Sequence, residues 1–203
     1  MPDVTPHEIS LAVWDLESPL VMSHSSKIKL GAKCSEGCPL TGQEIIVRDE
    51  AQMAVGTNKL GSEPWPGTSA LYWTEVDLTA PSAEGRFDWE VTLTASGLEL
   101  PHSTASSHFS FITVPAPEHC VTVKVVEKST ETPIDNAEVR LGVYRGRTGQ
   151  SGLANVELPK GTYDVVVYKL GYQAPPRAVE VTANVNVQIE IEPEPEPAQE
   201  YWM

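Results

Sequence analysis

The segment Cys120-Val-Thr-Val-Lys-Val-Val-Glu127 alternates apolar with polar residues and decides the fold class of this chain. In a β-strand, successive side chains point to opposite faces, so this pattern places Val123 and Val125 on one face and Lys124 on the other. The same alternation recurs along the chain, and no stretch keeps the helical period for three turns. The sequence therefore predicts an all-β protein.

Further strands follow outward from this segment, separated by turns rich in Gly, Pro, Ser and Asn. Toward the N-terminus the alternation predicts strands at 9–14, 27–33, 43–48, 71–78, 87–94 and 107–114. Residues 55–68, which contain Gly-Ser-Glu-Pro-Trp-Pro-Gly, are predicted to form a longer loop. Toward the C-terminus strands are predicted at 137–143, 153–158, 163–169, 178–182 and 185–191. Short strands at this spacing are typical of β-sandwiches.

A break in the alternation at Val114-Pro-Ala-Pro-Glu-His-Cys120 indicates a domain boundary. Two prolines interrupt the pattern there, and it restarts at once. We therefore expect two tandem β-sandwiches, an immunoglobulin-like one at 1–117 and a second one at 118–192. Residues 193–203 are predicted to form an extended acidic, Pro-rich tail, because alternating prolines and like charges favour polyproline II.

Four motifs in the second domain occur in a characteristic order. They are Pro133-Ile-Asp-Asn-Ala-Glu-Val139, Thr148-x-x-x-Gly152-Leu-Ala, Leu158-Pro-Lys-Gly161-Thr-Tyr163-Asp-Val165 and Gly171-Tyr172. Residues 118–192 thereby resemble the carboxypeptidase regulatory-like family, a transthyretin-like sandwich related to PEGA-type modules. The resemblance implies a non-catalytic scaffold or docking domain. Gly152 and Gly161 fit tight turns, and we expect Gly161 to need a positive φ.

The N-terminal domain resembles bacterial immunoglobulin-like domains more loosely, through its strand alternation and through Trp73 and Trp89. Its loops also contain Trp65 between Pro64 and Pro66. A large ring on a loop either packs against the protein or binds something, so Trp65 is a candidate sugar-stacking residue or a cap on the sandwich.

Charge and hydropathy exclude several classes of function. The 203 residues carry a net charge of −14, which repels nucleic-acid phosphates and disfavours nucleic acid as a partner. No apolar run approaches the roughly 18 residues of a membrane span, so no membrane insertion is expected. The first residues carry no secretory signal pattern, which predicts a cytoplasmic location. A surface or periplasmic location remains open if a signal was removed or if a partner carries the protein out.

The three cysteines are too few for a disulfide framework. Cys34 and Cys38 lie in Cys-Ser-Glu-Gly-Cys-Pro, a turn-like segment that is compatible with a short-loop disulfide and equally with a reduced pair. Zinc motifs usually add a second close pair of ligands, whereas the five histidines are scattered along this sequence. They are therefore interpreted as ordinary surface and loop residues, and no metal site or cofactor is expected.

The sequence favours a binding role over catalysis. No motif places a nucleophile beside a His and an acid, so no catalytic residues are assigned. The tail ends in Tyr201, Trp202 and Met203, which together resemble a short linear docking element. We expect a non-catalytic structural or docking subunit that binds other protein subunits through its sandwich surfaces and this tail. The alternative is a cell-surface carbohydrate-binding or adhesion module that uses Trp65.

Overall fold

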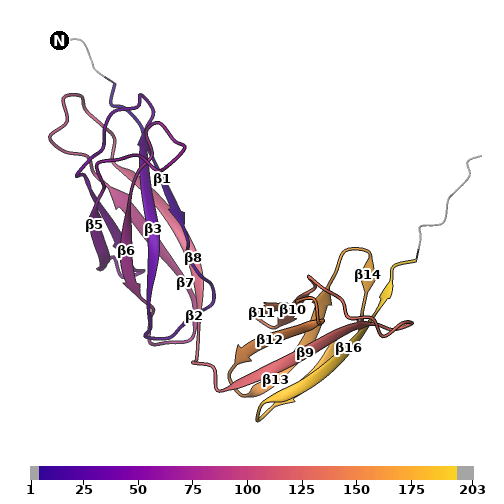
Figure 1. Cartoon of the computed structure of the whole chain (residues 1–203). Coiled ribbons are helices and arrows are strands. Elements are labelled where there is room, and N and C mark those ends of the chain that lie inside the picture. Colours follow the sequence, from indigo (N-terminus) through magenta and orange to yellow (C-terminus); the bar gives the residue numbers. More distant parts are fainter. Residues whose placement is uncertain (1–4, 196–203) are drawn as a thin grey trace, which may run out of the picture. The chain divides into compact units, whose positions relative to one another are not determined.

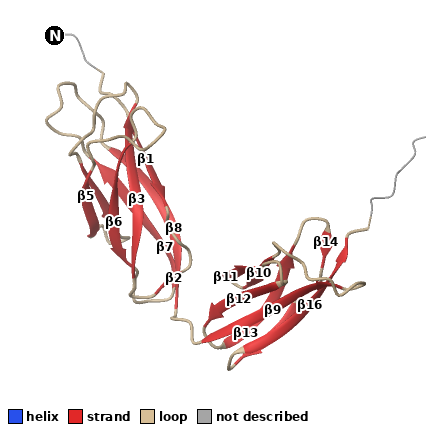
Figure 2. Ribbon diagram, in the orientation of Figure 1, coloured by secondary structure: helices blue, strands red, loops and turns tan. Residues whose placement is uncertain are grey.

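The computed structural model describes residues 5–195, and every regular element among them is a β-strand (Figures 1 and 2). The predicted all-β class is confirmed. The chain forms two compact units, Met1–Pro115 (unit 1) and Ala116–Met203 (unit 2). Within the described residues, no helix is present that could cross a membrane.

Unit 1 is a sandwich of two sheets. The three-stranded sheet has the order β1 (Ile9–Trp14), β3 (Ser25–Cys34), β6 (Tyr72–Thr79). The five-stranded sheet has the order β2 (Leu20–Val21), β8 (Ala105–Val114), β7 (Gly85–Leu93), β4 (Glu44–Arg48), β5 (Ala54–Lys59). Alternate residues of the strands fill the space between the sheets, and Trp89 packs edge-to-face on Phe111 at a ring-centroid distance of 4.8 Å.

Strand β5 corrects the prediction that residues 55–68 form a loop throughout. It pairs with β4 at the edge of the sheet, where most of its side chains are exposed. The apolar alternation is therefore absent from its sequence, although the backbone is extended. At Gly56 a Cβ atom would lie 2.6 Å from the Val76 and Leu78 side chains, so glycine lets β5 approach β6 closely.

Unit 2 is a sandwich of two four-stranded sheets. One sheet has the order β11 (Tyr144–Arg147), β10 (Glu138–Leu141), β13 (Gly161–Tyr168), β15 (Arg177–Val181). The other has the order β12 (Leu153–Leu158), β9 (His119–Glu127), β16 (Val185–Pro193), β14 (Tyr172–Gln173). Strands β16 and β9 run parallel, and Val123 and Val125 are buried while Lys124 is exposed, as the alternation predicts.

The two glycines singled out from the sequence behave differently. Gly152 has φ +72°, and a Cβ there would lie 2.6 Å from the Val125 carbonyl oxygen, so only glycine fits. Gly161 has no positive φ, and the expectation that it needs one is wrong. The chain bends at Lys160, and Gly161 already begins the extended strand β13.

Candidate functional site

Three segments far apart in the sequence meet at one end of unit 1. His7 precedes β1, Cys34 ends β3, Cys38 follows the turn after β3, and His102 precedes β8. Main-chain hydrogen bonds hold the segments together, because the His7 N–H donates to the Pro101 carbonyl at 2.9 Å and the His7 carbonyl accepts from Ser103 N–H at 3.0 Å. The first and last of these segments are thus fixed side by side.

The four side chains of this Cys-His cluster face one another. Their ligand-type atoms all lie within 4.8 Å of one another. His7 Nδ1 lies 3.2 Å from Cys38 Sγ and 3.8 Å from Cys34 Sγ, and His102 Nε2 lies 3.5 Å from Cys34 Sγ. The second ring nitrogen of His102, Nδ1, is 2.8 Å from the Leu100 carbonyl oxygen, to which it can donate a hydrogen bond. This bond leaves Nε2 as the acceptor nitrogen that faces the cysteines.

The two thiols differ in acidity. Burial raises the pKa of the Cys34 thiol. Hydrogen bonds outweigh this effect and bring the pKa down to about 6. They come from the main-chain N–H groups of Cys38 and Glu36 and from the side chains of Cys38 and His102. The pKa of Cys38 is raised, by burial and by its hydrogen bond with Cys34. At neutral pH Cys34 is therefore the thiol that ionises first.

For His7 and His102, the cluster corrects the interpretation of the five histidines as ordinary surface and loop residues. His7 and His102 are half-buried beside the cysteine pair, and their rings meet edge-to-face at 5.2 Å. No local pattern indicated this, because the two histidines are far from the cysteines and from each other along the chain. Cys34 and Cys38 are free thiols in this structure, and the disulfide between them stays a prediction.

Trp65 packs on the outer face of the three-stranded sheet of unit 1. Its ring meets Trp14 edge-to-face at 5.2 Å and Trp73 at 4.8 Å, and Lys29 Nζ lies 5.2 Å from its centroid. Gly31 makes room for this packing, because a Cβ there would come within 3.0 Å of the Trp14 ring. Trp65 thus anchors its loop against the sheet and is half-buried.

A polar groove of about 500 Å³ lies beside this aromatic packing. Trp73 lines it together with amide and carboxylate side chains, among them Asn58, Glu75 and Asp77. Trp73, Glu75 and Asp77 alternate along β6 with Val76 and Leu78, which are buried in the core. The outer face of β6 therefore combines an aromatic ring with polar groups.

A larger groove of about 850 Å³ runs along β16 in unit 2. Strand β14 pairs with β16 only at residues 192 and 193, and the chain then leaves through Ala174-Pro175-Pro176 to join the other sheet. Proline has no N–H to donate, so this segment cannot continue the pairing. Along Val185–Ile191 no strand among residues 5–195 pairs with the side of β16 that faces away from β9.

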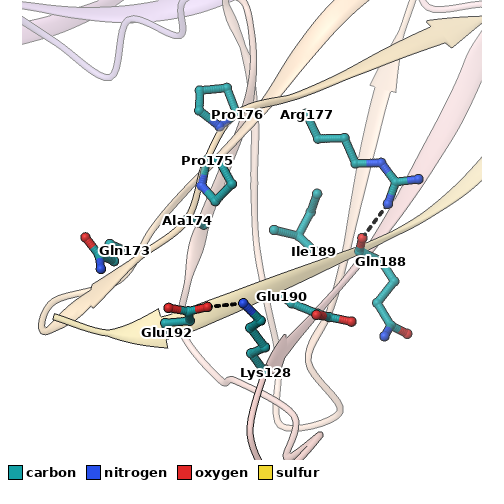
Figure 3. A pocket seen from close by; sticks show the side chains of 10 residues that line it. All are labelled: Lys128, Gln173, Ala174, Pro175, Pro176, Arg177, Gln188, Ile189, Glu190 and Glu192. Carbon is teal, nitrogen blue, oxygen red and sulfur yellow. Dashed lines mark hydrogen bonds and ion pairs between the residues drawn. The ribbon is translucent and has the colours of Figure 1, made fainter.

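The floor and rim of this β16 groove differ in polarity. Figure 3 shows Ala174 and Ile189 among charged and amide side chains, with Lys128 paired to Glu192. The Arg177 guanidinium donates to the Gln188 carbonyl oxygen at 2.8 Å, which shows that this main-chain group points into the groove (Figure 3). The groove is thus bounded by main-chain groups of an open strand edge.

The predicted docking residues Tyr201, Trp202 and Met203 lie outside the described residues. The remaining predicted binding residue, Trp65, lies in unit 1, where its ring packs on the sheet as described above. The sequence does not predict the β16 groove, because the prolines that prevent further pairing with β16, Pro175 and Pro176, lie in another segment, between β14 and β15.

Comparisons with known proteins support the fold. Residues 129–196 match the PEGA domain family, within unit 2, which supports a β-sandwich there. The carboxypeptidase regulatory-like assignment is not confirmed by this match and stays a prediction. No curated protein matches the chain.

Three solved structures of bacterial proteins are among those that match the chain. BcpA, the major pilin subunit of Bacillus cereus, is 10% identical over 92% of this chain and 70% of the pilin, with a TM-score of 0.34. The Yersinia pseudotuberculosis adhesin InvE is 18% identical over 87% of this chain and 59% of the adhesin, with a TM-score of 0.30. Invasin, a bacterial integrin-binding protein, is 16% identical over 86% of this chain and 39% of invasin, with a TM-score of 0.31. Because the sequence identities and TM-scores are this low, the functions of these three proteins are not assigned to this chain.

Proposed function

We propose that this chain is a non-catalytic docking module that binds a partner protein by accepting an extended segment along the open edge of β16. The observation that carries the proposal is the unpaired side of Val185–Ile191 beside a groove of about 850 Å³. An added strand makes main-chain hydrogen bonds to such an edge and places alternate side chains in the neighbouring groove.

The direction of the main-chain groups supports this mode of binding. The Ile191 carbonyl accepts from Lys128 N–H at 3.0 Å on the side of β9. Because main-chain groups alternate between the two sides of a strand, those of Gln188 and Glu190 face the groove. The Gln188 carbonyl already accepts a hydrogen bond from Arg177, and a partner N–H would replace this side-chain donor.

The tail supplies a second contact in this proposal. Tyr201, Trp202 and Met203 follow a Pro- and Glu-rich segment that begins at the end of β16. Aromatic residues dominate the energetics of many protein interfaces, so these three residues are the proposed anchor of the tail in a partner groove. The cytoplasmic location predicted from the sequence is supported by none of the comparisons, and the proposal assigns no compartment.

Two substitutions of one residue test the role of the strand edge. A photo-crosslinking residue at Glu190 first identifies the partner in cells of the source organism, and calorimetry then measures its affinity for the purified variants. Gln188→Pro removes the N–H that faces the groove, and we expect the dissociation constant to rise about tenfold. Gln188→Ala removes only the side chain and keeps the N–H, so it should change the dissociation constant less than about twofold. Equal affinities of the two variants would contradict binding by strand addition.

The carbohydrate alternative is favoured by one observation, the polar groove beside Trp73. Trp65, the residue proposed from sequence, does not line this groove, whereas Trp73 does, so Trp73 is the better candidate for stacking on a sugar. Binding of a panel of oligosaccharides that is lost in Trp73→Ala, and kept in the control Tyr168→Ala of unit 2, would support this alternative. No binding to any sugar of the panel by the unmodified chain would dismiss it.

A further inference from the structure

We propose that His7, Cys34, Cys38 and His102 form a tetrahedral Zn²⁺ site that links the two sheets of unit 1. The site is independent of the proposed docking function, since it lies in the other unit. Zinc in structural sites is bound by four Cys and His ligands, most often in tetrahedral geometry.

The distances between the four ligand atoms fit this geometry. With Zn–S bonds of about 2.3 Å and Zn–N bonds of about 2.0 Å, the edges of a tetrahedron measure about 3.3 to 3.8 Å. The three contacts across the Cys-His cluster measure 3.2, 3.5 and 3.8 Å. The remaining pairs of ligand atoms lie within 4.8 Å of each other, so a metal ion at the centre requires side-chain shifts of about 1 Å or less from this arrangement.

The surroundings of the ligands are also those of a metal site. The contact of His102 Nδ1 with the Leu100 carbonyl at 2.8 Å fixes the ring and directs Nε2 to the sulfurs. Ligating histidines almost always make such a bond through their second nitrogen. Cys34 is followed by a turn in which the Gly37 N–H donates to the Cys34 carbonyl at 3.0 Å, and Gly37 has φ +73°. This turn brings Cys38 back beside Cys34.

The chemistry of the ligands selects the metal. Two thiolates and two neutral imidazoles balance the charge of a divalent ion, and each thiol that binds as a thiolate releases its proton to solvent. Sulfur and imidazole ligands suit Zn²⁺, whereas Ca²⁺ and Mg²⁺ require oxygen ligands. Each of the four residues contributes one ligand atom, which makes four ligands in all. A site completed by four protein ligands is structural, because it keeps no position open for a substrate.

The position of the ligands defines what the metal would do. Cys34 ends β3 in the three-stranded sheet, and His102 leads into β8 in the five-stranded sheet. His7 leads into β1. The metal would therefore fasten three chain segments and both sheets at one end of unit 1, and its binding free energy would add to the stability of that unit.

Metal content and cobalt spectroscopy test the site on the full, untagged chain under reducing conditions. We expect one Zn²⁺ per chain by elemental analysis after purification, and Co²⁺ in place of Zn²⁺ should give thiolate charge-transfer bands and the visible absorption of tetrahedral cobalt. Cys38→Ser and His102→Gln replace half-buried ligands, so both variants should fold and lose the cobalt spectrum. The matched controls Cys120→Ser and His119→Gln, in unit 2, should keep it.

Two results would overturn the proposal. One is that the reduced, folded chain binds neither Zn²⁺ nor Co²⁺ at equimolar concentration. This result would count against the site even if mass spectrometry of the native protein finds Cys34 and Cys38 joined as a disulfide. The other is a cobalt spectrum that is the same in Cys38→Ser as in the unmodified chain. Circular dichroism of each variant establishes that a lost spectrum reflects a lost ligand and not an unfolded unit.

Discussion

Unit 1 packs aromatic rings between its sheets, whereas the buried cluster of unit 2 contains only Val, Ile, Leu and Ala. Trp89, Phe109 and Phe111 contact one another in unit 1. Among the described residues, each unit buries one threonine, Thr113 in unit 1 and Thr148 in unit 2, but only unit 1 also gathers two thiols and two imidazoles at one end. In unit 2 the Thr148 hydroxyl accepts from Ala137 N–H at 2.8 Å and donates to the Ile134 carbonyl at 2.7 Å.

Two sandwiches in one chain can therefore depend on different interactions. With Zn²⁺ bound at the proposed site, the stability of unit 1 would depend on the metal and on the redox state of the two thiols. Unit 2 depends instead on backbone geometry at its turns and on the satisfied hydrogen bonds of Thr148. Changes aimed at one unit should leave the other intact.

The two units can be followed separately by spectroscopy. Of the five tryptophans, four lie in unit 1 and the fifth is Trp202. In a Trp202→Phe background, tryptophan fluorescence reports the unfolding of unit 1 alone. Amide hydrogen exchange of β9 and β13 reports the unfolding of unit 2.

The largest effect is expected from Gly152→Val in unit 2. A Cβ at this position would lie 2.6 Å from the Val125 carbonyl oxygen, and φ is +72°. Backbone strain and the steric clash should together lower the free energy of unfolding of unit 2 by about 3 kcal/mol or more. Denaturant unfolding followed by hydrogen exchange measures this loss, and the fluorescence transition of unit 1 should not move.

Gly171→Ala is the matched control for this prediction. Gly171 has φ +78°, but nothing lies within 4 Å of its added Cβ, so only the backbone strain of about 1 kcal/mol applies. Equal losses in Gly152→Val and Gly171→Ala would show that the close approach to Val125 does not matter.

A smaller loss is expected from Thr148→Val. Valine keeps the shape of threonine but leaves the Ala137 N–H and the Ile134 carbonyl without their buried partner. The free energy of unfolding of unit 2 should fall by about 2 kcal/mol. Thr148→Ser retains the hydroxyl and should recover most of that loss. Thermal unfolding of the two variants measures the difference. Identical stabilities would show that the hydrogen bonds of Thr148 do not stabilise unit 2.

Trp65→Ala tests the aromatic packing of unit 1. The half-buried ring contacts Trp14 and Trp73, so its removal should destabilise unit 1 by about 1.5 kcal/mol without affecting unit 2. Trp65→Phe should retain part of the contact, so the stability of its unit 1 should lie between those of Trp65→Ala and the unmodified chain. An unchanged fluorescence transition in Trp65→Ala would mean that the ring does not anchor its loop.

The smallest effect on stability is expected from truncation after Pro195. The truncated chain keeps β16, which ends at Pro193, so both units should unfold within about 0.5 kcal/mol of the full chain. Association with the partner should weaken if Tyr201, Trp202 and Met203 anchor the tail, and Trp202→Ala should reproduce most of that change in calorimetry. Unchanged affinity in both variants would remove the tail from the proposed interface.

Much of the fold was predictable because strands with one buried face show alternation. Ile9–Trp14 and Leu153–Leu158 were predicted at their observed bounds. Strand β5 was not, because its side chains are mostly exposed, and β11 was not, because Tyr144-Arg-Gly-Arg147 carries no apolar alternation. Exposed edge strands are defined by their hydrogen bonds, which leave little trace in hydropathy.

The Cys-His cluster was not predictable from spacing. The Cys34–Cys38 spacing is compatible with half of a zinc motif, but the second half comes from two separate segments. His7 and His102 become neighbours through the parallel bridge between them, which joins distant parts of the chain. A site assembled from distant single residues leaves no local motif in the sequence.

The most direct test of the difference between the units is the Zn²⁺ dependence of their unfolding in the reduced Trp202→Phe chain. If the Cys-His cluster binds zinc, the fluorescence transition of unit 1 should gain about 4 kcal/mol when free Zn²⁺ reaches about a thousand times its dissociation constant. Hydrogen exchange in unit 2 should not change, and Cys38→Ser should abolish the gain. If the free energy of unfolding of unit 1 is the same with Zn²⁺ as with a chelator, the proposed Zn²⁺ site at the Cys-His cluster is contradicted.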